Sequence, residues 1–257
     1  MEWITAKLRQ PPEFNWHPDL YPDNAEATKQ FPTREILGSL GHLSNQTRLD
    51  ITQAVARLQR EAHAPTYSVT IAIKRILQYL AGTRTYGITF QRQPELQKDF
   101  LIGYADASWG VWDKYLEATM KSTSGYVITL YGTPISWRSA LQKGKPAQSS
   151  GESEYIAAYE CATEESHLKN ILTHYGADFL KHPLLCYTDS SACIGMSKNP
   201  VNHKRNKHIM LKYHWLRIAT DKNEIILKHL RTNEQPADLF TKVLKTHQQF
   251  RYLQDKL

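Results

Sequence analysis

Apolar residues recur every three or four positions in three stretches of the first third of the chain. This spacing places them on one face of a helix, so each stretch is predicted to form a short amphipathic helix. Helices this short must cover their apolar faces against one another, which predicts a small all-helical subdomain over residues 33–95. The three faces are Ile36, Leu37, Leu40 and Leu43, then Ile51, Val55 and Leu58, then Val69, Ile73, Ile76, Leu77 and Leu80.

The segments on either side of these helices differ from them. Residues 1–32 are rich in Pro, Asp and Asn and lack an apolar period, so they are predicted to form an extended lead-in. After the third helix, residues 86–90 are predicted to form a strand, followed by a polar link near Pro94.

From residue 98, short apolar runs bounded by turn residues replace the helical spacing. The runs "FLIGYAD", "SGYVITLYG" and "TPISWRSAL" follow one another closely enough to form antiparallel neighbours. A long helix from Gly151, the strand "PLLCYTD", helical sequence, the strand "EIILKHL" and a last helix from about Pro236 complete residues 98–257. This order predicts an α/β domain with a mixed sheet.

Composition indicates a class of partner and a compartment. The 257 residues include 32 Lys or Arg and 25 Asp or Glu, and the net charge of +7 suits a polyanionic partner. The three cysteines form no CxxC pair, so we expect buried, reduced thiols in an intracellular protein. No apolar run approaches the ~20 residues of a membrane span, so we expect a soluble protein with no membrane partner.

Four carboxylates occupy comparable positions in the predicted α/β domain. Asp106 ends its first strand and Asp189 its fourth, while Glu154 and Asp238 lie in the first turns of two helices. If the two strands are adjacent and parallel, both aspartates project at one edge of the sheet, within reach of the helix starts. Each acid also has a structural alternative. An aspartate such as Asp189 is often a turn former or an N-cap, and the helix dipole favours acids in a first turn.

The long helix offers two glutamates, and their spacing distinguishes them. Ser149 and Glu152 have the S-x-x-E spacing of a capping box, which engages Glu152 with backbone N–H groups. Glu154 projects elsewhere and is the better candidate for the shared edge. Converging carboxylates repel one another, and hard oxygen ligands suit Mg²⁺. Two such ions, ~3.5–4 Å apart, activate water and stabilise the leaving oxygen of a phosphodiester.

Several motifs together resemble one family. The stretches "KSTSGYV", "ISWRSALQ", "SSGESEYIAA", "YTDSSACI", "NPVNHKRNKHI" and "PADLFTK" are similar to the ribonuclease H domain of copia-type retrotransposon polyproteins. Two earlier stretches, "REILGSLGHLSNQTRLDI" and "AIKRILQYLAGTRTYGI", resemble the reverse-transcriptase thumb or connection segment that precedes it. Residues 33–95 are therefore expected to be a remnant of that segment, and residues 98–257 a ribonuclease H domain.

The resemblance implies a fold, an activity and a set of ligands. The fold is a ribonuclease H-like five-stranded mixed sheet flanked by helices, and the activity is hydrolysis of the RNA strand of an RNA–DNA hybrid. Two Mg²⁺ ions, with Mn²⁺ as a substitute, are held by Asp106, Glu154, Asp189 and Asp238. His229 stands where ribonucleases H often carry a mobile histidine that helps the product leave, although an ordinary strand histidine fits equally well.

The chain departs from the family pattern in two ways. The stretch after Asp106 is a few residues longer than usual, with Ser108 where a second acid is common. The paired-aspartate motif of the polymerase is absent from the sequence, so we expect a C-terminal piece or truncated derivative that cannot polymerise DNA.

A basic segment supplies candidate contacts with nucleic acid. Residues 198–217 contain six Lys or Arg, three His and no acid, which beside a phosphodiester site favours phosphate contact over an ordinary solvated face. The histidines have poor zinc spacing and no nearby Cys. The predicted nucleic-acid-binding residues are Lys198, Lys204, Arg205, Lys207, Lys212 and Arg217.

Three functional hypotheses follow. The first is a two-metal ribonuclease H joined to a helical module, with an RNA–DNA hybrid and the polymerase portion of a reverse transcriptase as partners, in cytoplasmic particles or the nucleus. The second is a catalytically silent truncated or domesticated remnant that binds nucleic acid or a polymerase. The third is a structural domain whose acids are helix caps. Four acids in matched contexts favour the first.

Overall fold

The computed structural model describes residues 21–90, 100–110, 120–176, 182–198, 210–244 and 246–257. The chain divides into two compact units. The helical unit comprises Met1–Ile88 with Lys242–Gln254, and the sheet unit comprises Thr89–Thr241 with Asp255–Leu257. No helix in the described ranges has the length and apolar character that crossing a bilayer requires.

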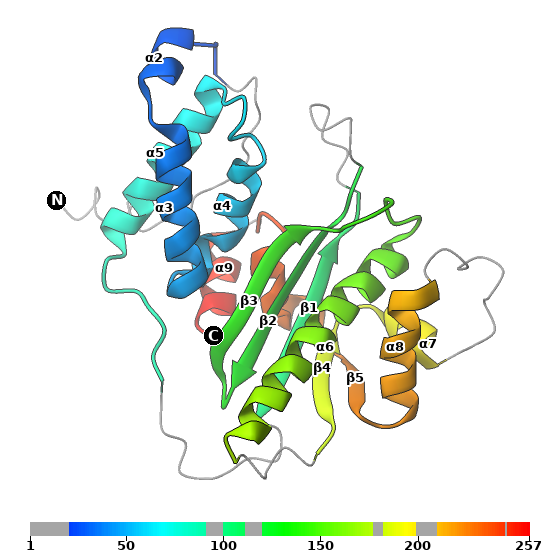
Figure 1. Ribbon diagram of the computed structural model, residues 1–257. Helices are drawn as coiled ribbons and strands as arrows, with labels where there is room; N and C mark the ends of the chain where they lie inside the picture. The colour runs from blue at the N-terminus through cyan, green and yellow to red at the C-terminus, as the bar shows by residue number, and fades with distance from the viewer. Residues whose placement is uncertain (1–20, 91–99, 111–119, 177–181, 199–209, 245) are drawn as a thin grey trace. The chain divides into compact units, whose positions relative to one another are not determined.

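The helical unit confirms the three helices that the apolar spacing predicts. Their side chains form one buried cluster that includes Leu37, Leu58 and Ile73, because each helix presents its apolar face to the others. The elements of this unit are α2 (Ala25–Gln30), α3 (Thr33–Gln46), the 3₁₀ helix η2 (Leu49–Ile51), α4 (Thr52–Gln59), α5 (Tyr67–Gly82) and α9 (His247–Gln254) (Figure 1).

Two local predictions for this unit are wrong. Helix α2 lies inside the segment predicted to be extended, and it begins where the Asn24 side chain accepts the Ala27 N–H at 3.1 Å. A cap rather than an apolar period therefore marks its start. Residues 86–90 form no strand, and this short stretch contains Gly87 and the exposed Phe90.

The C-terminal helix belongs to a different unit from the one that the sequence analysis assigned. Residues 98–257 were expected to form one domain, but α9 clusters with the helical unit. Val243 packs against the helical core, and the Gln254 side chain donates to the Asp50 carboxylate at 3.5 Å. These are tertiary contacts between residues about two hundred positions apart, which no local pattern encodes.

The sheet unit contains a five-stranded mixed sheet in the order β3-β2-β1-β4-β5. Strand β1 pairs antiparallel with β2 and parallel with β4, while β2–β3 is antiparallel and β4–β5 parallel. This confirms the mixed sheet flanked by helices that the resemblance implies. The strands are β1 (Leu101–Ser108), β2 (Thr123–Leu130), β3 (Thr133–Leu141), β4 (Leu184–Thr188) and β5 (Ile225–His229).

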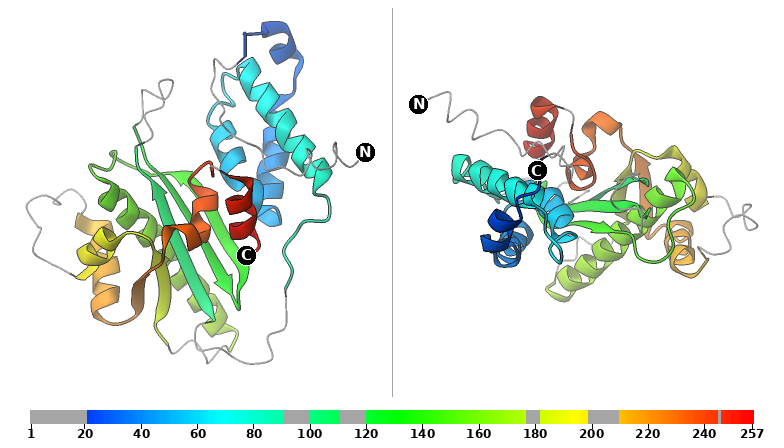
Figure 2. Two further views of the ribbon diagram at one scale, coloured as in Figure 1. Left: turned by 180° about the vertical axis from the view of Figure 1, so that it is seen from behind. Right: turned by 90° about the horizontal axis from the view of Figure 1, so that it is seen from above.

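The two faces of this sheet are covered differently. Helix α6 (Ser150–His174), with α7 (Ser191–Lys198) and α8 (Met210–Asp221) beside it, packs on one face (Figure 1). Across the other face runs the 3₁₀ helix η7 (Pro236–Phe240), seen from behind in Figure 2. It follows the short 3₁₀ helix η6 (Thr232–Glu234). The α-helix predicted from Pro236 is therefore a 3₁₀ turn, and the α-helix itself starts only at His247.

The core between the sheet and α6 holds the thiols and one acid. Cys161, Cys186 and Cys193 are buried and free of disulfides, as predicted. Glu165 of α6 is fully buried beneath β1, where a Cβ added to Gly103 would lie 3.1 Å from its Oε2. Burial raises the pKa of the Glu165 carboxyl well above its ordinary value, and the neighbouring Cys186 thiol adds to that shift.

Candidate metal centre

The parallel pairing of β1 and β4 brings two aspartates to one edge of the sheet. Tyr104 pairs with Tyr187, and their rings stack with centroids 5.5 Å apart. Asp106 and Asp189 each follow two residues after this pair, so they project from the same carboxyl edge. Such edges are where open α/β sheets usually bind ligands.

Helix α6 supplies the third acid through a well-defined start. The Ser149 hydroxyl accepts the Glu152 N–H at 3.2 Å, and the Glu152 carboxylate accepts the Gln148 N–H at 2.7 Å. Glu152 is therefore bound to backbone, as predicted, although it reaches one residue before the cap. The Glu154 carboxylate instead accepts the Ala107 N–H at 3.1 Å, which directs it to the end of β1.

A buried glutamine fixes this helix start to the sheet. The Gln142 amide donates to the Ser153 carbonyl at 2.8 Å and to the Ser124 hydroxyl on β2 at 3.0 Å. Because Ser153 immediately precedes Glu154, these bonds hold the backbone that carries the candidate ligand.

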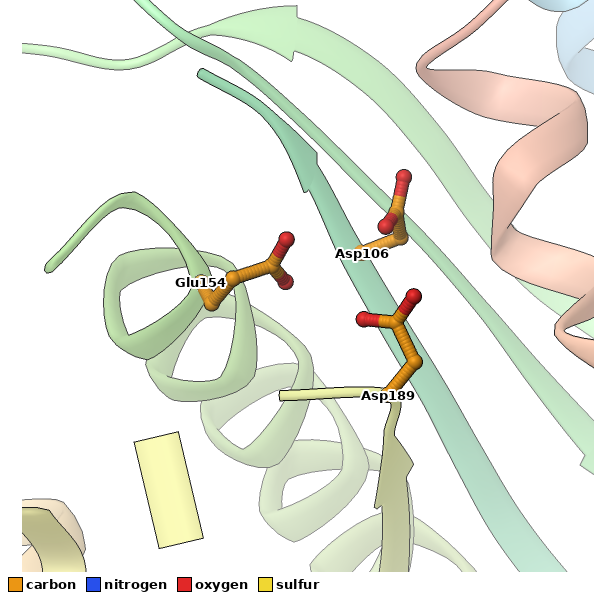
Figure 3. Close-up of side chains that lie close together, drawn as sticks. All are labelled: Asp106, Glu154 and Asp189. Carbon is orange, nitrogen blue, oxygen red and sulfur yellow. The ribbon is translucent and has the colours of Figure 1, made fainter. Parts of the chain in front are cut away.

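Three carboxylates converge as a result. One oxygen from each of Asp106, Glu154 and Asp189 can be chosen so that all lie within 4.8 Å of one another, and the side chains point together in Figure 3. Asp106 is fully buried, while Asp189 is half-buried and keeps the group at a partly open edge.

The donor set fits a hard divalent cation. Like charges this close repel one another, and a bound cation offsets that repulsion. Carboxylate oxygens are the preferred ligands of Mg²⁺ and Mn²⁺, while a zinc site is typically built from His and Cys. The three acids therefore suit Mg²⁺ or Mn²⁺ by their chemistry.

The capping alternative for Asp189 is wrong. The side chain that caps α7 is Ser190, whose hydroxyl accepts the Cys193 N–H at 3.2 Å. The Asp189 carboxylate accepts the Thr232 hydroxyl at 2.9 Å instead. Since the next residue satisfies the helix end, capping does not explain why the strand ends on an acid.

Asp238 lies on η7, which packs against β1 and β2, and is not a member of the cluster of three acids. It is buried on η7, and its N–H donates to the Gln235 carbonyl at 3.2 Å. Among the described residues, the group of acids that meets the 4.8 Å spacing contains Asp106, Glu154 and Asp189. A role for Asp238 as a fourth ligand stays a prediction.

Curated relatives align with most of this chain at 38–39% identity. The chain is 39% identical over 212 residues to the retrovirus-related Pol polyprotein from transposon RE2 of Arabidopsis thaliana. It is 38% identical over 214 residues to that from transposon TNT 1-94 of Nicotiana tabacum. The matches cover 82% and 83% of this chain. The chain is homologous to retrotransposon Pol polyproteins.

The matched region is a small part of those Pol relatives, covering 14% and 15% of their lengths. No protein-family model matches the chain. Among solved structures, a foamy viral protease–reverse transcriptase in complex with double-stranded DNA is similar with a TM-score of 0.42 and 13% identity. That comparison covers 90% of this chain and 35% of the viral one.

The other predicted site residues, His229 from the Pol resemblance and the cations of the basic segment 198–217, lie in different places. His229 is exposed at the end of β5, paired in register with Thr188, the residue before Asp189. Lys198 is exposed at the end of α7, and Arg217 of α8 donates to the His214 ring at 2.7 Å. The remaining predicted contacts lie where no side chain is described, at Lys204, Arg205, Lys207 and Lys212.

Sequence reasoning missed two threonine side chains beside the acids. Thr241 donates its hydroxyl to Asp106, and Thr232 donates its hydroxyl to Asp189. Thr241 stands in the quoted motif "PADLFTK", so its neighbourhood carried a signal. Thr232 lies outside the quoted motifs, and no signal marked it.

Proposed function

We propose that the sheet unit hydrolyses the RNA strand of RNA–DNA hybrids, with two divalent cations held by Asp106, Glu154, Asp189 and Asp238. The convergence of three carboxylates at the carboxyl edge of a parallel strand pair is the observation that carries this proposal. The basic composition and the similarity to retrotransposon Pol polyproteins support a nucleic acid as substrate.

The chain's own residues hold and orient the charged groups. The β1–β4 pairing sets the separation of the two aspartates, and the Ala107 N–H aims Glu154 at the end of β1. These carboxylates would hold Mg²⁺, which would supply activation of a water and stabilisation of the leaving oxygen. Exposed His229, beside the strand that carries Asp189, is proposed to help the product leave. The basic residues of 198–217 are proposed to bind the phosphate backbone.

The deciding experiment compares Glu154 with Glu152, which lies two residues earlier on the same helix. Purified protein is offered a labelled RNA–DNA hybrid with Mg²⁺, Mn²⁺ or EDTA, and RNA–RNA and DNA–DNA duplexes are run in parallel. We expect cleavage of the RNA strand of the hybrid with either metal and none in EDTA. Glu154→Gln should lower the cleavage rate by more than about 100-fold, because ligand loss should exceed the 10- to 100-fold typical of supporting residues.

Glu152→Gln is the matched control on the same helix turn. Its side chain accepts a backbone N–H, which glutamine also accepts, so cleavage should stay within a few-fold of the parent. Hybrid binding without metal-dependent cleavage would contradict the proposal and favour a silent binding module. Equal loss in both variants would show that helix distortion, rather than a lost ligand, accounts for the effect.

A further inference from the structure

The segment that follows β5 contacts both Asp106 and Asp189. This post-β5 segment, residues 230–241, carries Asp238 as well as two threonines that bond to the other acids. The Thr232 hydroxyl donates to Asp189 Oδ2 at 2.9 Å, and the Thr241 hydroxyl donates to Asp106 Oδ2. One stretch of chain therefore reaches each aspartate through a neutral donor.

One main-chain and one side-chain hydrogen bond fix this segment to the strands next to the two aspartates, β4 and β1. The Leu230 N–H donates to the Thr188 carbonyl of β4 at 2.9 Å. The fully buried Gln235 amide donates to the Ala105 carbonyl of β1 at 3.1 Å. The anchor points are the residues immediately before Asp189 and Asp106. The donors and the acids are thus held on one rigid support.

A glycine lets the end of the segment approach the sheet closely. Gly125 of β2 is the register partner of Asp106. A Cβ at this position would lie 2.6 Å from Thr241 Cγ2 and 2.8 Å from Phe240 Cβ, closer than real contacts allow. The close packing of Thr241 beside Asp106 therefore depends on the missing side chain at residue 125.

We propose that Thr241 and Thr232 are positioning residues for Asp106 and Asp189, and that the post-β5 segment thereby sets the affinity of the site for its cation. The proposal rests on the metal site of the proposed function. A carboxylate has two oxygens and about four acceptor sites, so accepting one hydroxyl leaves it able to bind a cation in a fixed orientation. Partners of this kind typically change metal affinity or activity by 10- to 100-fold.

The two threonines should differ in importance because of their burial. Thr241 is 5% exposed and Asp106 is 0% exposed, so water is a poor substitute for the lost hydroxyl there. Thr232 is exposed and Asp189 is half-buried, so water can replace that donor. Loss of the hydroxyl at residue 241 should therefore weaken cation affinity more than its loss at residue 232.

The test measures cation affinity directly. Calorimetric titration with Mg²⁺ and Mn²⁺ is carried out on the full chain and on five variants, with thermal melts in EDTA to check folding. Thr241→Val, which keeps the shape but removes the hydroxyl, should weaken affinity by about 10- to 100-fold. The cation affinity of Thr241→Ser, which keeps the hydroxyl, should remain within about threefold of the parent's. The affinity of Thr232→Val should remain within about tenfold of it, at the low end of the range given above.

Thr129→Val is the matched control for loss of a buried hydroxyl. Thr129 is 2% exposed on β2 and donates to the Ile102 carbonyl at 3.4 Å. This variant should melt earlier and bind cations as the parent does. Thr241→Ala is made as well, since it adds no atom beside the carboxylate and serves if the valine variant does not fold.

The failures of the two proposals can be told apart. A parent chain that binds neither cation would overturn the metal site and the positioning role together. A parent that binds, with Thr241→Val or Thr241→Ala binding equally well, would overturn the positioning role alone. Equal weakening by Thr129→Val would also overturn it, because general loosening of the sheet would then explain the loss.

Discussion

In the helical unit the carboxylate of Asp50 is buried against a cation of the same chain, whereas in the sheet unit three carboxylates approach one another. Arg48 donates to both Asp50 oxygens, at 2.9 and 2.7 Å, and the Tyr79 hydroxyl donates to Oδ2 at 2.7 Å. Asp50 and Arg48 are 8% and 5% exposed. The charge of this acid is compensated within the unit itself.

Three acids of the sheet unit instead have one another as neighbours. The donors described above for Asp106, Glu154 and Asp189 are a backbone N–H and two threonine hydroxyls, all of them neutral. Neutral donors orient a carboxylate without cancelling its charge. An arrangement that tolerates repulsion in this way is typical of a functional site, where stability is given up for binding. The difference teaches that burial of acids alone does not mark a site, but their mutual approach does.

Breaking the pair in the helical unit should have the largest effect on stability. Arg48→Met keeps most of the side-chain volume but leaves the Asp50 carboxylate buried without its cation. The free energy of unfolding should fall by about 3–5 kcal/mol, the usual cost of removing one partner of a buried pair. Urea unfolding followed by circular dichroism measures this change.

Arg84→Met is the control for this variant, since Arg84 is exposed and a surface change should stay within about 0.5 kcal/mol. Excess Mg²⁺ should rescue neither variant, because the acid concerned is not in the metal cluster. If Arg48→Met lowers the free energy of unfolding by less than about 1 kcal/mol, the Arg48–Asp50 pair contributes no more than a weak surface ion pair.

Glu165 is a third kind of buried acid in this chain, one whose pKa is raised by burial. Its pKa is raised in the folded protein, so the folded state holds its proton at pH values where the unfolded state has lost it. The free energy of unfolding should therefore fall as pH rises above about 4.3, by up to about 1.4 kcal/mol per pH unit, until the folded pKa is passed. Glu165→Gln removes this dependence.

Urea unfolding of the parent and of Glu165→Gln at pH 5, 6, 7 and 8 tests that expectation. The variant should gain stability over the parent as pH rises, because glutamine resembles the protonated acid and cannot ionise. A constant difference across this range would mean that Glu165 is ionised in both states or in neither.

Removing one acid from the cluster should have the smallest effect on stability but the opposite sign. Asp189→Asn relieves repulsion in the metal-free protein, which should melt slightly later in EDTA. Metal at ten times its dissociation constant should stabilise the parent by roughly 1.4 kcal/mol and the variant by less. Hybrid cleavage should fall much further than hybrid binding.

Asp221→Asn, which changes an exposed acid at the end of α8, is the control and should match the parent in both melts. Thermal melts with EDTA and with excess Mg²⁺, alongside cleavage assays, make the measurement. If Mg²⁺ raises the melting temperatures of Asp189→Asn and the parent equally, and their cleavage rates agree within a few-fold, Asp189 is not a metal ligand.

The sequence predicted those features that depend on local pattern. The apolar spacing located α3, α4 and α5, and the apolar runs located the five strands. Predicted strand ends pointed to Asp106 and Asp189, although β1 continues past Asp106 to Ser108. The S-x-x-E spacing correctly separated Glu152 from Glu154. These features rest on the periods of helices and strands and on the chemistry of a helix cap.

What the sequence could not predict depends on contacts between distant residues. Thr241 meets Asp106 across 135 positions, and Thr232 meets Asp189 across 43. Nothing in the sequence around Thr232 marks it, and the motif that contains Thr241 does not say which residue Thr241 meets. The 3₁₀ form of η7 is likewise tied to its place against the sheet, where Gln235 and Gly125 decide how closely it packs.

The order of synthesis gives the divided helical unit a further consequence. The ribosome makes α2 to α5 before residues 89–241 of the sheet unit, and only then residues 242–254. Leu253 is fully buried and Gln254 reaches Asp50 across 204 positions, so the first-made unit is completed last. Domains generally fold as units in the order in which they emerge. Until residues 242–254 are made, the surface of α3 to α5 that they cover remains exposed, throughout the synthesis of the sheet.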